Sequence, residues 1–364
     1  MLNLTIKAED NVVIDNIKES LNLDELEDVI NNSIEKNGFS DVISTSDLLT
    51  GNYITPETLF GKLLQLGFKQ LYNAITSNIN ILIVIIIIAI LKTFELEKNS
   101  DIIKVANFVC YIAISTLLLK NFVEILDMFK NSIDNIITII QVASPFLMGV
   151  LIATGSMTAA GLIQPLILFA VSAISFLISY IVVPLIVVSV AFNIVHSLNE
   201  GLGLAKLSKS FLNFSLWSVG VMLTIFLGIL SLESSISSSV DSLAVKATSS
   251  AVSNFVPVVG KFFSDSLETV IGASKIVGNV GGTLGIIAIF IIAILPIIKL
   301  VCISIVYNMF SALLEPICKD GKVLDVISNF ASIYKIMIGI MVGVSMLFII
   351  SIGIIMKLSA VTLG

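Results

Sequence analysis

Lys299 is the only charged residue within the apolar run from Gly285 to Val306. An ionisable residue at that depth of a membrane-spanning helix costs about 3 kcal/mol or more if it faces lipid. Two predictions therefore stay open. Either Lys299 faces protein or water and takes part in function, or its long side chain reaches the membrane surface from a helix shortened at Pro296.

A polar stripe follows Lys299 on the same predicted helix. Its members recur at i, i+4, i+7 and i+11, which places them on one face, about 160° from Lys299 at 100° per residue. They are Ser304, Asn308, Ser311 and Glu315. Two polar faces on one helix predict two separate contacts with protein or water.

The sequence carries none of the residue patterns that a membrane enzyme would use. It has no HExxH, no GxSxG and no Walker-type GxxxxGK[ST] motif, so these kinds of hydrolysis and of ATP binding are not predicted. Its three cysteines form no CxxC pair, and its single histidine, His196, follows the end of an apolar run. We therefore predict a protein that is not an enzyme and that needs no cofactor or metal ion.

The composition places the chain outside the class of soluble globular proteins. Hydrophobic residues make up 56% of the 364 residues, charged residues only 13%, and the mean hydropathy is +1.05. A membrane span needs about 20 consecutive, mostly apolar residues. The sequence therefore predicts an all-α, polytopic membrane protein with about seven transmembrane helices, which are residues 77–94, 102–119, 136–153, 162–195, 211–232, 284–314 and 333–356.

Two of these segments, 162–195 and 284–314, are too long for one upright crossing at about 1.5 Å per residue. Each contains a proline, Pro184 or Pro296, that can bend or break a helix. Broken spans are therefore one of the expected features of the fold.

A glycine-rich, uncharged turn is predicted ahead of the first long segment, over residues 153–165. Gln164 and Pro165 stand at its end. A tight hairpin is the preferred interpretation, and an unwound segment that lines a pore is the alternative.

The chain divides into two regions by charge. Residues 1–77 hold twelve Asp or Glu and five Lys, whereas the remainder is close to neutral. Residues 1–76 are predicted to be a small, acidic, soluble helical region that ends in a lead-in amphipathic helix, with Thr55 as its N-cap and Pro56 at its first position. Residues 77–364 are predicted to form a multi-pass membrane domain.

Two further amphipathic segments are predicted to lie at the membrane interface. The first, residues 120–140, sets an apolar stripe against a net acidic face and is expected to pack on other protein. The second is a helical hairpin with serine-rich arms at about residues 233–279, at the interface or dipping into a protein-lined cavity. Its elbow and capping residues are Pro257, Gly260, Asp265 and Glu268.

The lysines predict an orientation in the membrane. The loop from Lys92 to Lys104 holds three lysines between the first two predicted spans. By the positive-inside rule this loop is cytoplasmic, which places the acidic region 1–76 on the other side.

Three segments give the chain a resemblance to a known family. They are "GSMTAAGLIQPLILF" (Gly155–Phe169), "NFVPVVGKFFSDSLETVIG" (Asn254–Gly272) and "LPIIKLVCISIVYNMFSALLEP" (Leu295–Pro316). Together they resemble the stage III sporulation protein AE family of endospore-forming bacteria. The resemblance covers the chain from about residue 77 to its end, and the middle segment is the most specific.

The resemblance implies a location and a set of partners. It implies a permease-like, non-enzymatic subunit in the mother-cell membrane around the forespore, within a multi-protein channel or secretion-like complex that joins the two cells. Its partners would be other membrane and soluble subunits, a separate ATPase and the lipid bilayer, with no nucleic acid and with a homo-oligomer left open. One departure is that family members usually begin with a secretory signal, whereas residues 1–10 lack a basic segment followed by an apolar one.

A second class of function stays open beside the channel subunit. Pro184, Pro296 and Lys299 are also compatible with a self-contained small-molecule permease whose broken helices surround a site at the midplane. We favour the channel subunit, and the proteins that copurify from sporulating cells in mild detergent would discriminate the two.

Overall fold

The computed structural model describes residues 35, 56–94, 100–153, 157–198, 203–236, 280–316 and 322–361. Nearly all of these residues are helical, which confirms the predicted all-α class. The helices are α4 (Pro56–Ser77), α5 (Ile79–Phe94), α6 (Ser100–Ala153), α7 (Met157–Leu177), the π-helix η1 (Ile178–Val182), α8 (Val183–Leu198), α9 (Leu204–Ile236), α12 (Val280–Leu314) and α13 (Lys322–Val361).

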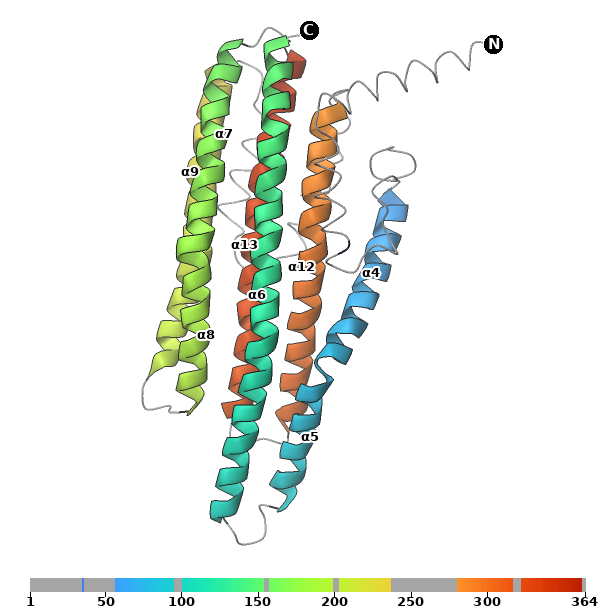
Figure 1. Cartoon of the computed structure of the whole chain (residues 1–364), viewed down its shortest axis with the longest axis vertical. Helices are drawn as coiled ribbons and strands as arrows, with labels where there is room; N and C mark the ends of the chain where they lie inside the picture. The colour runs from blue at the N-terminus through green and yellow to red at the C-terminus, as the bar shows by residue number, and fades with distance from the viewer. Residues whose placement is uncertain are drawn as a thin grey trace, which may run out of the picture.

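The helices form an elongated bundle around the pair α12 and α13 (Figure 1). α6 packs along both members of this pair. α7, α8 and α9 cover one side of the bundle, whereas α4 and α5 lie on the other side, with α4 against α12. The core is centred on α12, α13 and the inner face of α6, and the other helices also contribute buried side chains to it.

Five helical segments are long and apolar enough to cross a membrane, or six if the bent pair Leu63–Ser77 and Ile79–Ile88 counts as one span. The predicted number of about seven is not reached among the described residues. The five segments are Phe108–Pro145, Ile163–Leu198, Leu204–Ile229, Ile289–Leu314 and Val323–Ile354.

The largest difference from the sequence prediction concerns α6. The predicted spans 102–119 and 136–153, and the interfacial helix at 120–140 between them, are one continuous helix of 54 residues. The apolar stripe is real, since Phe129, Ile133 and Ile136 are fully buried. The stripe packs against the α12–α13 pair and not against a membrane surface. The helix therefore continues past both ends of the stripe.

The two prolines of the long spans behave differently. Before Pro184 the helix passes through η1, where the Val183 N–H donates to the carbonyl of Ile178. Pro184 has no backbone N–H to donate to the preceding turn, and the π segment lies just before it. α12, in contrast, continues through Pro296 as one helix.

The lead-in helix begins as predicted, because α4 starts at Pro56. Its apolar stripe packs on protein: Leu66 is fully buried, and the Sγ of Cys302 in α12 lies 3.5 Å from the Gly67 carbonyl oxygen. α9 extends to Ile236, so residues 233–236 of the predicted hairpin are helical. The remaining hairpin residues, among them Pro257, Gly260, Asp265 and Glu268, lie outside the described residues.

Candidate functional site

Asn78 forms the break between α4 and α5, where the two helix segments meet at 51°. Its backbone N–H donates to the Ile75 carbonyl at 3.2 Å, three residues back, rather than to Ala74. The side-chain Nδ2 of Asn78 takes over and donates to the Ala74 carbonyl at 2.7 Å. The asparagine therefore satisfies the backbone group that the bend leaves without its helical donor.

The Oδ1 of Asn78 accepts hydrogen bonds from two other helices. Asn121 of α6 donates its Nδ2 at 2.6 Å, and the Tyr307 hydroxyl of α12 donates at 3.0 Å. Asn78 and Tyr307 are both buried, at 4% and 0% exposed. This polar node, which comprises Asn78, Asn121, Tyr307 and the adjacent Tyr334, ties the break to α6 and α12.

Tyr334 brings the node to α13. Its ring centroid lies 5.5 Å from that of Tyr307, and the residue is fully buried. Among the described residues the Tyr334 hydroxyl makes no hydrogen bond of ordinary geometry, and its close polar neighbour is the Tyr307 hydroxyl. A buried donor without a partner costs about 1–3 kcal/mol, so this hydroxyl is a weak point in the otherwise satisfied node.

A second set of polar contacts joins α8 to its neighbours at the end of the bundle where α9 begins. Asn329 of α13 donates to the Oδ1 of Asn193 at 2.5 Å, and the Tyr111 hydroxyl of α6 donates to the Ile194 carbonyl at 2.7 Å. Ser189 and Ser208 exchange hydrogen bonds of 2.8–2.9 Å between α8 and α9. These amide and hydroxyl contacts fix how α8 sits against α6, α9 and α13.

Lys299 lies partly exposed on α12, two helical turns from Tyr307 along the chain. It is not part of the polar node. The structure brings no acidic side chain of the described residues within ion-pair distance of it. Its role therefore stays a prediction.

The predicted polar stripe on α12 divides into members with different surroundings. Ser304 is buried and donates to the Ala331 carbonyl of α13 at 3.0 Å. Asn308 donates to the Ser304 carbonyl at 2.8 Å, within its own helix. Ser311 is partly exposed and Glu315 is exposed. Of the four, Ser304 makes the contact between helices.

Gln164 and Pro165 both lie exposed on α7. α7 is helical from Met157 onward, so residues 157–165 of the predicted turn 153–165 belong to a helix. The unwound, pore-lining interpretation is therefore wrong for residues 157–165.

The residues of the polar node were missed by the sequence analysis. Asn78 carries a local signal, because "TSN" interrupts two helical patterns, and short polar residues favour such breaks. Asn121, Tyr307 and Tyr334 carry none, since the hydrogen bonds of the node join residues up to 229 positions apart. Only the packing of the helices brings them together.

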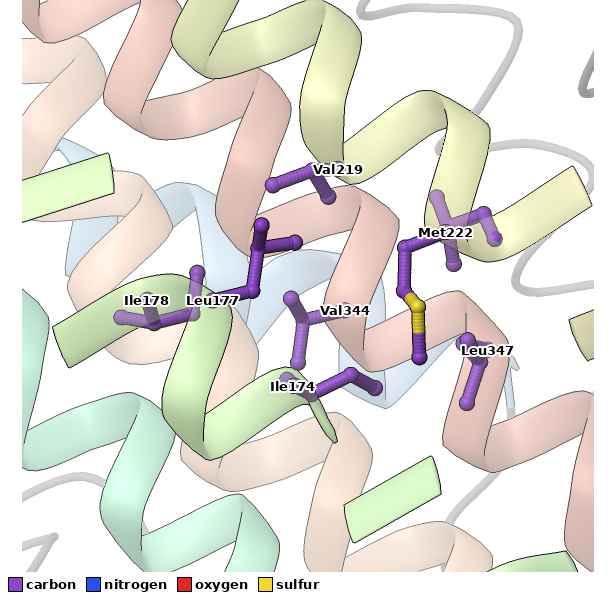
Figure 2. Close-up of a pocket in the computed structure, with 8 residues that line it drawn as sticks. Ile174, Leu177, Ile178, Val219, Met222, Val344 and Leu347 are labelled. Carbon is purple, nitrogen blue, oxygen red and sulfur yellow. The ribbon is translucent and has the colours of Figure 1, made fainter. Parts of the chain in front are cut away.

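A narrow apolar gap lies beside η1, between α7, α9 and α13 (Figure 2). It is too narrow for a water molecule, and Met222 reaches into the same region from α9. The gap is thus a packing feature and not a ligand site. It is lined by Ile174, Leu177, Ile178, Val219, Met222, Leu223, Val344 and Leu347.

Among the described residues, no three His, Cys, Asp or Glu side chains gather in a way that would hold a metal ion. The polar node itself contains amides and phenols only. Such groups donate and accept hydrogen bonds, and they position helices rather than transfer protons at neutral pH.

The apolar helices of membrane length, joined by buried amide and hydroxyl contacts, define a polytopic α-helical membrane protein. Residues 41–359 match the family model described as stage III sporulation protein AE, and the chain therefore belongs to that family. This confirms the resemblance drawn from the three segments.

One relative supports this assignment. The chain is 29% identical over 269 residues to stage III sporulation protein AE of Bacillus subtilis (strain 168). The aligned region covers 72% of this chain and 67% of that protein. No solved structure matches the chain.

Proposed function

We propose that this chain is a non-enzymatic membrane subunit of a multi-protein channel or secretion-like complex that links mother cell and forespore during endospore formation. Its site would be the mother-cell membrane around the forespore. The observation that carries the proposal is the family match over residues 41–359, in a chain whose described part is a bundle of helices of membrane length.

The polar side chains that join the helices support a structural subunit. Asn78, Asn121 and Tyr307 bond to one another across three helices, and Asn193 bonds to Asn329 across two. Hydrogen bonds between helices fix the positions of the helices relative to one another, as a structural subunit requires. Any energy for transport would then come from a separate ATPase subunit or from a gradient.

The bent pair α4–α5 favours a second candidate, the self-contained small-molecule permease. Discontinuous helices with polar groups at the break form the substrate sites of many transporters. Here the break carries Asn78, and α12 also presents the partly exposed Lys299.

Copurification tests the two candidates directly. The full chain, tagged and produced in sporulating cells, is extracted in mild detergent and its companions are identified by mass spectrometry. A channel subunit brings other membrane proteins and an ATPase with it. A chain that purifies without companions, and that alone moves small solutes into lipid vesicles, would favour the permease.

A further inference from the structure

The first half of α6 carries a continuous stripe of exposed side chains. The stripe runs from Val105 to Val123 in alternating steps of four and three residues, which keeps its members on one side of the helix. Its five apolar members are between 37% and 63% exposed, and the sixth, Thr116, is exposed as well. The outer α6 stripe comprises Val105, Val109, Ile112, Thr116, Leu119 and Val123.

This end of α6 projects, together with α5, beyond the ends of the other helices (Figure 1). Tyr111 is eleven residues into α6, yet its hydroxyl bonds to Ile194, only four residues before the end of α8. Asn121 is twenty-one residues into α6, yet it bonds to Tyr307, only seven residues before the end of α12. At about 1.5 Å per residue, the two contacts leave about 10–20 Å of α6 beyond α8 and α12.

Two of the other helices expose charged residues level with the outer α6 stripe. Asp325 lies five residues before Phe330, which contacts Phe122, and α13 runs in the same direction as α6. Glu315 lies eight residues after Tyr307, and α12 runs in the opposite direction. Both charged side chains are exposed. At about 1.5 Å per residue, both lie level with the middle of the stripe.

α9 exposes a third charged side chain at this level, that of Lys209. Lys209 follows Ser208, whose side chain bonds to Ser189 of α8 at 2.8–2.9 Å. Ser189 lies five residues before Ile194, which accepts the hydrogen bond of Tyr111. Because α8 and α6 run in opposite directions, Lys209 is level with the α6 residues about one and a half turns after Tyr111. This is again the middle of the outer α6 stripe.

Lipid therefore does not suit the outer α6 stripe as a cover. An ionised side chain that faces the hydrocarbon core costs free energy, so the exposed charges on α9, α12 and α13 place this level at the membrane surface or outside it. The apolar side chains of the stripe, at this level and on the projecting end, would then meet water. Packing against protein removes that apolar surface from water.

We propose that the outer α6 stripe packs against the same stripe of a second copy of this chain. Copies inserted into one membrane share an orientation, so a two-fold axis normal to the membrane sets their α6 helices parallel. Each stripe residue then meets its own copy at the same height. Apolar side chains favour such a contact, whereas charged side chains oppose it.

Spacing and residue type support this choice of partner. Steps of four and three residues are those of the a and d positions in a coiled coil. Val109, Thr116 and Val123 take the a positions, where two-stranded parallel coiled coils favour β-branched residues. The Thr116 hydroxyl donates to the Ile112 carbonyl of its own helix at 2.8 Å, so its donor is not left unpaired when the stripe is covered.

The pairing ends before Lys130. This exposed lysine takes the a position after Val123, and two such lysines at the same height would repel each other. The interface is therefore limited to residues 105–123, or about 27 Å of helix.

The size of the outer α6 stripe fits a pair of chains. Six side chains with about half of their surface open offer roughly 600 Å² per copy, and the total of roughly 1,200 Å² lies at the lower end of stable interfaces. α5 packs beside α6, and its Ile86 and Ile90, 48% and 53% exposed, extend the apolar surface. The inference does not rest on the proposed channel complex, because the pairing needs no other protein.

Disulfide crosslinking tests the pairing in the full-length chain. The chain is produced in a host that makes no other sporulation protein, with Cys110, Cys302 and Cys318 replaced by Ala. Thr116→Cys, near the centre of the stripe, should give a disulfide-linked dimer on mild oxidation of the membranes. Met309→Cys on α12, at a residue that is 48% exposed near the same level, is the matched control and should stay monomeric.

Further crosslinks separate a fixed interface from chance collisions in the membrane. Val109→Cys should crosslink as Thr116→Cys does, whereas Glu124→Cys, exposed on α6 outside the stripe, should crosslink far less. Equal crosslinking of Thr116→Cys and Met309→Cys would overturn the proposal. Monomers in every variant would overturn it too, whether lipid or another protein then covers the stripe.

Copurification of two differently tagged copies supplies a second measurement. The wild-type copies should copurify, and Val109→Lys in both copies should lower the copurified amount about tenfold, because like charges then face each other. Met309→Lys in both copies, an equal change outside the stripe, should leave the amount unchanged. Equal losses from the two substitutions, or wild-type copies that do not copurify, would contradict the proposal.

Discussion

The central helix α12 and the outer pair α4–α5 show opposite responses to a residue that disturbs a helix. α12 passes through Pro296 without a break, although proline removes a backbone donor. α4 and α5 meet at 51° at Asn78, where no proline is present. In this bundle the position of a break is therefore not set by proline.

Packing and hydrogen bonding explain the difference. Leu295 and Ile297, on either side of Pro296, are buried, and α12 packs against α13, α6 and α4 along its length. At the α4–α5 break, the Asn78 side chain replaces a lost helical hydrogen bond and also bonds to α6 and α12. A helix breaks where a side chain can satisfy the freed backbone, and it stays straight where its neighbours leave no room.

Removal of the apolar packing between α6 and α13 should have the largest effect. Phe330→Ala leaves a cavity beside Phe122 in a site with 0% exposure, and we expect a loss of about 3–5 kcal/mol in the free energy of unfolding. Thermal unfolding in detergent measures it. Phe214→Ala, at a residue that is 49% exposed, is the control and should change stability little. Equal losses would mean that the α6–α13 contact is not part of the core.

Disruption of the polar node should come next in size. Asn78→Ala removes the acceptor for Asn121 and Tyr307 and the donor to Ala74, so buried polar atoms lose partners at a cost of about 2 kcal/mol. The same change should reduce the bend between α4 and α5, measured as a longer distance between spin labels at Leu64 and Ile90. Asn73→Ala, exposed on α4, serves as the control. An unchanged distance would show that packing alone sets the bend.

The two tyrosines of the node should respond with opposite signs to the same substitution. Tyr334→Phe removes a buried hydroxyl that makes no hydrogen bond of ordinary geometry among the described residues, and we expect stability to rise by about 1 kcal/mol. Tyr307→Phe removes the donor to Asn78, and stability should fall by a similar amount. Thermal unfolding of the pair in one detergent decides the matter, and losses in both variants would show that the Tyr334 hydroxyl has a partner after all.

The start of α4 and the continuity of α6 differ in how well the sequence predicts them. The start of α4 at Pro56 was predicted because an N-cap and a proline at the first helical turn are local signals. The continuity of α6 was not, because charged residues such as Glu124 and Asp127 in the middle of an apolar pattern resemble a membrane boundary. Whether such charges mark a boundary or an interface depends on what packs beside them, and that is a property of the whole bundle.

The same limit applies to the candidate site. The α12 polar stripe was predicted as a repeat on one face, but a repeat does not tell which member meets a neighbouring helix. Only Ser304 does so, through the Ala331 carbonyl, while Asn308 bonds within its own helix. Spacing gives the direction of a side chain, and the distance to the next helix decides its contact.

The smallest effect expected concerns this pair of stripe residues. Ser304→Ala removes one hydrogen bond between α12 and α13, and such bonds are worth about 0.6 kcal/mol on average in a membrane protein. The Ala331 carbonyl that loses its side-chain donor still belongs to the backbone hydrogen bonds of α13, so no buried group is left fully without a partner. Asn308→Ala removes only a bond within α12 from an exposed position, and its effect should be smaller still. A larger loss from Asn308→Ala, with both variants present in the membrane at equal amounts, would contradict this order. The exposed side of the α12 stripe would then meet a partner outside this chain, and that contact would matter more than the buried contact of Ser304 with α13.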